Sequence, residues 1–331
     1  MHQLRYYINR VKVLCINNIS FLPQLFPVDA CTYAPLLRRL VLSDGRSGNI
    51  ENRVGRLIAP NLLQLEKAVL IPLSMLIKHS PRLVQFQDVY YSYGAQELHD
   101  LLFNHRNLIT CVIRYCESPR NRLSRPPSHT IVLNHLTSFS VFWDSRFPLN
   151  EFRVVLSQIE APNIHELYFS EDRHLEDFDG DIITILASWL SRFRNRLDIL
   201  TVASAGIPEV DLEAFQTLLN AVPGLVHLCF KGYLINDATI HILDLELHPS
   251  LCPILQGLEF INVRMGTVES LAHMVISRSR PPDRNEDSDP FVLTLKSIIW
   301  DHWAFYLLDD SDPDPRYELK KLESQWNFKL V

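Results

Sequence analysis

The sequence has no hydrophobic run long enough to cross a membrane and no recognisable secretion signal. Its longest uncharged apolar stretches are Ala68–Ile77 and Ile182–Leu190, far short of the roughly 20 residues that a transmembrane helix needs. A basic region followed by an apolar one, as a signal peptide requires, is also missing from the start of the sequence. We therefore expect no membrane partner, and a cytoplasmic or nuclear protein whose six cysteines stay reduced.

Patterns that carry catalytic or metal chemistry are missing as well. The sequence has neither a GxSxG nucleophile turn nor an HExxH zinc helix. Cys111 and Cys116 lack the spacing and the second pair of a zinc site. The acidic stretch Glu171–Asp181 lacks the closing glutamate of a calcium loop, and the turn at Gly45–Gly48 is not a phosphate-binding motif. We expect no enzyme activity, no cofactor and no bound metal.

The charge balance gives little support for nucleic acid as the main ligand. The net charge is −6 over 331 residues, and 47% of the residues are hydrophobic, which is an ordinary globular composition. A basic surface patch would be the usual sign of a nucleic-acid-binding protein. The arginines around Arg120–Arg125 are instead expected to lie in a solvated loop.

A short apolar pattern recurs along almost the whole chain. In Ile164–Phe169, apolar residues occupy the first, fourth and sixth places. The motifs centred on Leu65 and Phe86 depart from it, because Lys67 and Asp88 occupy their sixth places. The central residues of the motifs, separated by 21 to 40 residues, are Leu14, Leu40, Leu65, Phe86, Cys111, Phe139, Leu167, Leu200, Leu228, Leu258 and Ile298.

This pattern resembles the strand motif of the leucine-rich repeat superfamily. The resemblance implies an α/β solenoid of about ten to eleven irregular repeats. A curved parallel β-sheet would line its concave face, and helices and loops would form its convex face. The prediction is a single solenoid over residues 1–331, with polar loops at 117–130 and 279–290 and a C-terminal cap at 309–331.

Helical periodicity and proline punctuation separate the motifs. Six segments with apolar residues on one helical face are expected as helices: Ala95–Phe103, Glu151–Ile159, Ile182–Phe193, Leu212–Val222 after the N-cap Asp211, Thr239–Leu245 and Val268–Ile276. Proline followed by a polar residue often precedes a motif, as at Pro60-Asn61, Pro81-Arg82 and Pro162-Asn163. Proline is expected to end each helix and to turn the chain into the next strand.

The start of the array has no separate capping unit, because the first motif begins at Val11. A solenoid needs an atypical terminal unit to shield its first apolar face. Two alternatives stay open. Either Leu4, Tyr6, Tyr7 and Ile8 cover this face, or a segment upstream of this sequence does so.

The irregular repeats, with Ala-Pro-Asn before some strands, resemble the repeat arrays of fungal F-box/leucine-rich-repeat proteins. In that family an N-terminal F-box docks to a cullin-RING ubiquitin ligase and the repeats hold the substrate. No F-box helices precede Val11 in this sequence. The resemblance thus implies substrate recognition by the repeats, with a cullin-RING adaptor bound only through a segment absent here. The alternative is a stand-alone binding or structural module without a ligase link.

Alternation along the strands predicts which side chains form the concave face. Eleven strands spaced by about 4.8 Å would make a ladder roughly 50 Å long, and this face is large enough for a standard protein interface of about 800 Å² per partner. We therefore predict a non-enzymatic scaffold that binds a protein partner on this face. The predicted contact residues are Arg39, Gln64, Glu66, Gln85, Gln87, Arg114, Phe142, Glu166, Tyr168, His227, Lys231, Glu259 and Asp301.

Overall fold

The computed structural model describes the chain in two compact units, unit 1 (Met1–Ala161) and unit 2 (Pro162–Val331). The described residues are 7–27, 31–43, 55–68, 73–115, 130–143, 149–171, 182–193, 195–204, 208–261, 263–265, 267–279, 297–300 and 329–330. Apart from their end residues Thr130 and Ser279, the predicted loops at 117–130 and 279–290 lie outside them, and so does most of the predicted cap at 309–331. A single solenoid over the whole chain stays a prediction.

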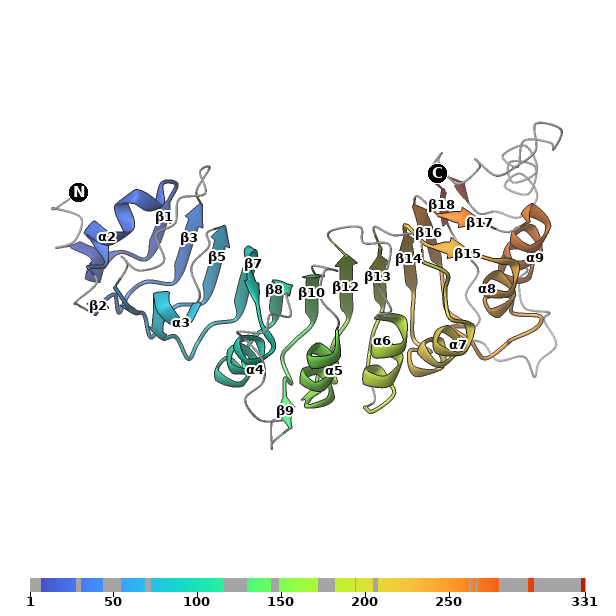
Figure 1. Ribbon diagram of the computed structural model, residues 1–331, viewed down its shortest axis with the longest axis horizontal. Coiled ribbons are helices and arrows are strands. Elements are labelled where there is room, and N and C mark those ends of the chain that lie inside the picture. Colours follow the sequence, from blue (N-terminus) through green and yellow to red (C-terminus); the bar gives the residue numbers. More distant parts are fainter. Residues whose placement is uncertain are drawn as a thin grey trace. The chain divides into compact units, whose positions relative to one another are not determined.

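Six parallel strands form the sheet of unit 1 (Figure 1). In spatial and chain order they are β1 (Val13–Ile16), β3 (Arg39–Ser43), β5 (Gln64–Ala68), β7 (Gln85–Tyr93), β8 (Thr110–Tyr115) and β10 (Ser138–Trp143). Their register aligns the predicted motif centres Leu14, Leu40, Leu65, Phe86, Cys111 and Phe139 in one row. The six predicted strands of unit 1 and their register are therefore confirmed.

Unit 2 repeats the arrangement with strands β12 (Glu166–Glu171), β13 (Ile199–Ala203), β14 (His227–Lys231), β16 (Gly257–Ile261), β18 (Ser297–Trp300) and β19 (Lys329–Leu330). Leu167, Leu200, Leu228, Leu258 and Ile298 are register partners, so these motif centres are confirmed too. The described part of the predicted cap, β19, pairs with β18 and continues the sheet.

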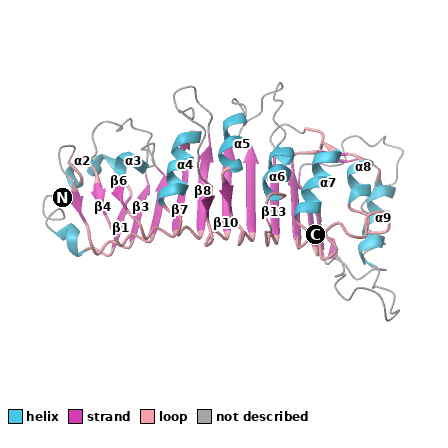
Figure 2. Ribbon diagram, turned by 90° about the horizontal axis from the view of Figure 1, so that it is seen from below, coloured by secondary structure: helices cyan, strands magenta, loops and turns pink. Residues whose placement is uncertain are grey.

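Helices cover one face of each sheet (Figure 2). Unit 1 contains α2 (Leu22–Leu25), α3 (Leu73–Leu76), α4 (Ala95–Asn104) and α5 (Asn150–Ser157), together with the 3₁₀ helices η1 (Ile8–Arg10) and η2 (Ile19–Phe21). Unit 2 contains α6 (Ile182–Leu190), α7 (Leu212–Ala221), α8 (Asp237–Ile242) and α9 (Val268–Ser279). The six predicted helices are present with ends shifted by up to three residues, and Asp211 caps α7 by accepting from the Ala214 N–H at 2.9 Å. In the described residues no helix is both long and apolar enough to span a bilayer.

Short strands also pair between successive repeats, which the repeat pattern did not predict. One set comprises β2 (Thr32–Tyr33), β4 (Leu57–Ile58) and β6 (Ile77–His79). Two further pairs are β9 (Ile131–Val132) with β11 (Ile159–Glu160), and β15 (Leu234–Ile235) with β17 (Arg264–Met265). Two- or three-residue strands are too short to show a hydrophobic period, so the backbone pairing between repeats defines them.

The proline motifs form tight turns that feed the main strands. The Leu62 N–H donates to the Ala59 carbonyl at 3.1 Å, and the Leu83 N–H donates to the Ser80 carbonyl at 3.2 Å. Proline therefore occupies the second position of a turn, where its fixed φ is suited. The prediction that proline ends a helix is wrong for the repeats in which β4 or β6 precedes the turn, because the residue before proline favours extended geometry.

The core follows the motif even where the sixth residue is charged. Lys67 and Asp88 are register partners on β5 and β7, and their side chains are fully buried with Nζ and Oδ2 2.7 Å apart. The Tyr93 hydroxyl donates to the same Asp88 oxygen at 2.7 Å, and the N–H groups of Tyr90 and Tyr91 donate to the other oxygen. Burial lowers the pKa of Lys67, an effect that Asp88 opposes. Complementary charge thus replaces two apolar core residues.

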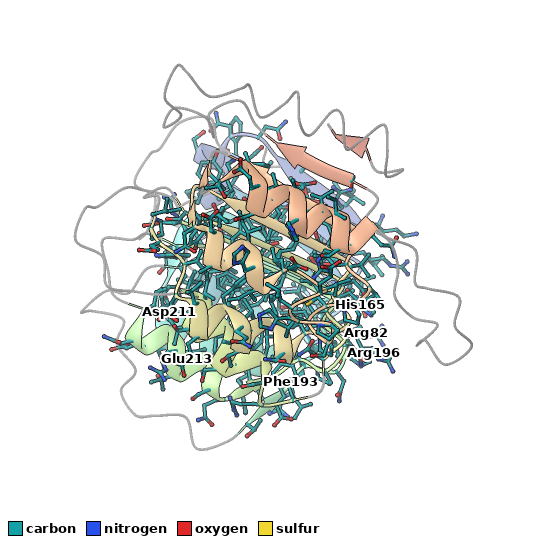
Figure 3. The ribbon with its side chains drawn as sticks, turned by 90° about the vertical axis from the view of Figure 1, so that its right-hand side faces the viewer. Arg82, His165, Phe193, Arg196, Asp211 and Glu213 are labelled. Atoms are coloured by element: carbon teal, nitrogen blue, oxygen red, sulfur yellow. The ribbon has the colours of Figure 1, made fainter. Side chains whose placement is uncertain are left out.

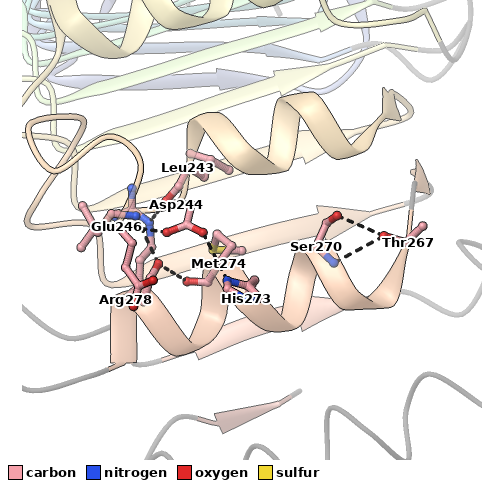
Figure 4. A network of polar contacts seen from close by, with 10 residues as sticks. Leu243, Asp244, Glu246, Thr267, Ser270, His273, Met274 and Arg278 are labelled. Atoms are coloured by element: carbon pink, nitrogen blue, oxygen red, sulfur yellow. Dashed lines mark hydrogen bonds and ion pairs between the residues drawn. The ribbon is translucent and has the colours of Figure 1, made fainter.

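Unit 2 also contains a buried charged side chain, an arginine that donates to backbone carbonyls (Figure 4). Arg278 of α9 is 1% exposed. Its guanidinium donates to the carbonyls of Leu243, Leu251 and Cys252, the last two at 3.1 and 3.0 Å. Burial lowers its pKa to about 10, so it stays charged at neutral pH. Arg278 therefore fastens α9 to the loop that follows α8.

Candidate protein-binding faces

The sheet face opposite the helices presents the predicted contact residues of unit 1. Arg39, Gln64 and Gln85 are neighbours in one row, and Glu66 and Gln87 are neighbours in the next. Arg114 and Phe142 are paired on β8 and β10 and are half-buried. The structure therefore brings all seven unit 1 residues of the prediction to one face, which we call the exposed face of unit 1.

An exposed ion pair links two of these residues. Arg39 Nη2 lies 2.7 Å from Glu66 Oε1, and the two side chains are 46% and 42% exposed. Such pairs contribute at most about 1 kcal/mol to stability because water screens them. The pair therefore contributes little to the stability of unit 1.

The exposed face of unit 2 carries five of the six contact residues predicted there. Glu166 and Lys231 are exposed, whereas Tyr168, His227 and Glu259 are half-buried. Glu166 and His227 lie in one row of the register, and Tyr168 and Glu259 lie in the next. The sixth residue, Asp301, lies outside the described residues.

Glycine makes room for a polar cluster on this face. His227 Nε2 lies 3.1 Å from Glu259 Oε1 on the neighbouring strand β16. A Cβ atom at Gly257 would come within 2.2 Å of His227 Nδ1. Only a glycine at this position therefore leaves space for the imidazole to lie across β16 toward Glu259.

Alternation along β14 places Cys229 between His227 and Lys231 on the same face, but Cys229 is only 5% exposed. Thr201 and Glu259 flank it in the same row, and burial is the main cause that raises its pKa to about 12. A thiol that stays protonated at neutral pH is a poor nucleophile. Cys229 therefore acts as a buried packing residue between Thr201 and Glu259.

A histidine–carboxylate pair at the edge of unit 2 was not foreseen. His165 Nδ1 lies 2.7 Å from Asp198 Oδ2. Both residues immediately precede a strand, at the edge where the chain enters the sheet. Figure 3 shows His165 and Arg196 at this edge, opposite Asp211 and Glu213 at the start of α7. The pair could have been found only by aligning the residues that precede successive motifs.

The part of the chain that the structure describes contains no cluster of side chains suited to bind a metal ion. No group of three or more His, Cys, Asp or Glu side chains is placed to hold a metal ion there. Cys111 is fully buried, and burial raises the pKa of its thiol well above the usual range. Cys116, Gly45–Gly48 and most of Glu171–Asp181 lie outside the described residues.

The registers define the class of protein. Each unit is an α/β solenoid of leucine-rich repeats, with a parallel sheet on one side and helices or short strands on the other. In the motifs from Leu14 to Phe260 the first, fourth and sixth residues lie in the core, apart from the half-buried Val11 that opens the first motif, and Lys67 and Asp88 are the charged members of this core.

Comparisons with known proteins add no family name. No protein-family model matches the chain, and the search of curated proteins found no match. Among solved structures, TLR13 in a TLR13–ssRNA13 complex is 13% identical over 87% of this chain, with a TM-score of 0.33. This chain covers 44% of the length of that TLR13 chain. An internalin (InlF) from Listeria monocytogenes is 12% identical over 82% of this chain and 86% of its own, with a TM-score of 0.31.

Proposed function

We propose that the chain is a non-enzymatic scaffold that binds a protein partner on the exposed faces of its repeats. The observation that carries this proposal is the strict parallel register, which lines up outward side chains of successive repeats in rows. The rows combine both signs of charge with amides and with the aromatic residues Phe142 and Tyr168. Aromatic and arginine side chains supply much of the binding energy at protein interfaces.

Partner capture with matched variants tests the proposal. The double variant Glu166→Lys/Tyr168→Ala alters the exposed face of unit 2 without touching the core. The control variant Glu213→Lys makes the same charge change on α7, at the far edge of the unit (Figure 3). A partner captured by the unmodified chain should be lost with the double variant and kept with the control. Equal capture by the two variants, or equal loss, would contradict the proposal.

For the finer role we propose substrate recognition of the F-box type, with ubiquitin-ligase docking through a segment not contained in this sequence. Its support is the irregular repeat with Ala-Pro-Asn before the strand, at Ala59–Asn61 and Ala161–Asn163. Quantitative mass spectrometry of the captured complexes tests this role. Cullin-RING subunits should co-purify with the full-length protein, and their absence would favour a stand-alone binding module.

We also propose that the protein works in the cytoplasm or the nucleus. The support is the use of cysteine as a core residue, since Cys111, Cys229 and Cys252 are buried free thiols. Imaging of the endogenously tagged protein tests this proposal. A signal confined to the secretory pathway would contradict it.

A further inference from the structure

A basic hollow lies at the edge of unit 1 where the chain enters β1, β3 and β5. Its volume is about 420 Å³, and its lining residues are Lys12, Pro35, Leu36, Arg38, Asn61, Leu63 and Arg82. None of these residues belongs to the predicted contact set. Lys12 and Arg38 directly precede β1 and β3, and Arg82 lies in the turn before β7. Three cations from three different repeats thus line one hollow.

Backbone pairing and side-chain hydrogen bonds hold these cations in place. The Arg38 N–H donates to the Lys12 carbonyl at 2.8 Å, and the Leu63 N–H donates to the Arg38 carbonyl at 2.8 Å. The Asn61 amide donates to the Pro35 carbonyl at 2.7 Å and accepts from Arg82 Nη1 at 3.1 Å. Asn61 therefore fastens the guanidinium of Arg82 to the preceding turn, at the edge where Figure 3 shows Arg82.

The cations of the hollow have no acidic counterpart among the described residues. As far as the structure describes unit 1, no carboxylate lines the hollow, and none of the described ion pairs involves Lys12, Arg38 or Arg82. All three side chains are exposed. The whole of unit 1 is basic, with 18 Lys and Arg against 11 Asp and Glu, a net charge of +7. Unit 2 has 14 against 27, a net charge of −13. The mild acidity of the full chain therefore conceals a basic unit 1.

We propose that this hollow binds an acidic segment of a partner protein, with carboxylates on the three cations and an apolar side chain against Leu36. Arginine forks pair with carboxylates through two parallel hydrogen bonds. Leu36 is 46% exposed and, with Pro35 and Leu63, supplies an apolar wall. Within the described part of unit 1, no aromatic side chain lines the hollow to stack a nucleotide base. The proposal rests on the protein-binding role inferred above and adds that the bound segment of the partner is acidic.

Peptide binding to the full chain tests the proposal. The probe is a fluorescent glutamate-rich peptide with a central leucine, and its control replaces each glutamate by glutamine. The glutamate peptide should bind about tenfold or more tightly than the glutamine peptide, as expected for hydrogen bonds to charged groups. Its affinity should fall as salt rises, because exposed charges are screened. Absence of binding by the glutamate peptide would overturn the proposal.

Matched variants locate the binding. Arg38→Glu/Arg82→Glu should weaken the glutamate peptide by about tenfold or more, whereas Arg153→Glu, an exposed charge reversal on α5, should leave its affinity unchanged. Circular dichroism establishes that the variants fold. Affinity that survives Arg38→Glu/Arg82→Glu would overturn the proposal, as would tighter binding of inorganic phosphate or of an oligouridine probe.

Peptide binding by the unit 2 double variant distinguishes this proposal from the proposed function. Glu166→Lys/Tyr168→Ala should leave glutamate-peptide binding intact, because its substitutions lie in unit 2. Failure of partner capture with intact, arginine-dependent peptide binding would refute only the role of the exposed faces. Intact partner capture without peptide binding would refute only the acidic ligand of the hollow.

Discussion

The buried pair of Lys67 and Asp88 gives the sharpest prediction, which concerns Asp88→Asn. This substitution keeps the shape of the side chain and one oxygen for the N–H groups of Tyr90 and Tyr91, but it removes the partner charge of Lys67. Loss of one partner from a buried ion pair costs about 3–5 kcal/mol. If the lysine is instead buried uncharged, its deprotonation alone costs about 4.6 kcal/mol at pH 7 for a reference pKa near 10.4. Both values lead us to expect a loss of about 3–5 kcal/mol at pH 7.

The stability lost through Asp88→Asn should become smaller as the pH rises. Burial lowers the pKa of folded Lys67, and without Asp88 this pKa falls further. Between the folded and the unfolded pKa, the unfolded chain binds more protons, so stability rises with pH. The difference between the variant and the unmodified protein should therefore shrink as the pH is raised from 7 toward 10.

Urea denaturation at several pH values measures both quantities. Asp100→Asn, an exposed carboxylate change on α4, is the control and should alter stability by no more than about 0.5 kcal/mol. In the double variant Lys67→Met/Asp88→Asn, which buries no charge, much of the lost stability should return. A loss below about 1 kcal/mol for Asp88→Asn, or one that does not change with pH, would refute the reasoning.

Two further predictions concern buried groups of unit 2. Arg278→Met leaves three carbonyls without their donor and should lower the free energy of unfolding, measured in urea, by about 3 kcal/mol. The control Arg196→Met, at an exposed residue, should change this free energy by no more than about 0.5 kcal/mol. Similar losses for the two variants would contradict the structural role assigned to Arg278. In mass-spectrometric alkylation of the native protein at pH 8, the exposed Cys15 should react, whereas Cys229, with its pKa raised to about 12, should stay unmodified. Equal modification of the two thiols would contradict the burial of the Cys229 side chain.

The sequence predicted the parts of the fold that repeat. Each motif centre could be found from its own six residues, and the register then followed because units with the same strand motif stack in parallel. The same holds for α7, whose cap and apolar face are local features. The binding role of the exposed faces stays a prediction.

Features that depend on two repeats at once could not be predicted in this way. Lys67 and Asp88 each break the motif when taken singly, and only their side-by-side register explains how both are buried. The burial of Cys229 depends on Thr201 and Glu259 of adjacent strands. The basic hollow likewise joins side chains from three repeats, none of which is unusual within its own repeat.

Alternation of side chains between core and exposed face is the central claim, and two adjacent residues test it directly. Leu167 is fully buried beside Leu200, whereas Glu166 is exposed. In parallel urea denaturations, Leu167→Asp should lose about 4 kcal/mol or more, because it buries an unpaired charge. Glu166→Lys should stay within about 0.5 kcal/mol of the unmodified protein. Equal destabilisation by the two variants would contradict the assigned faces.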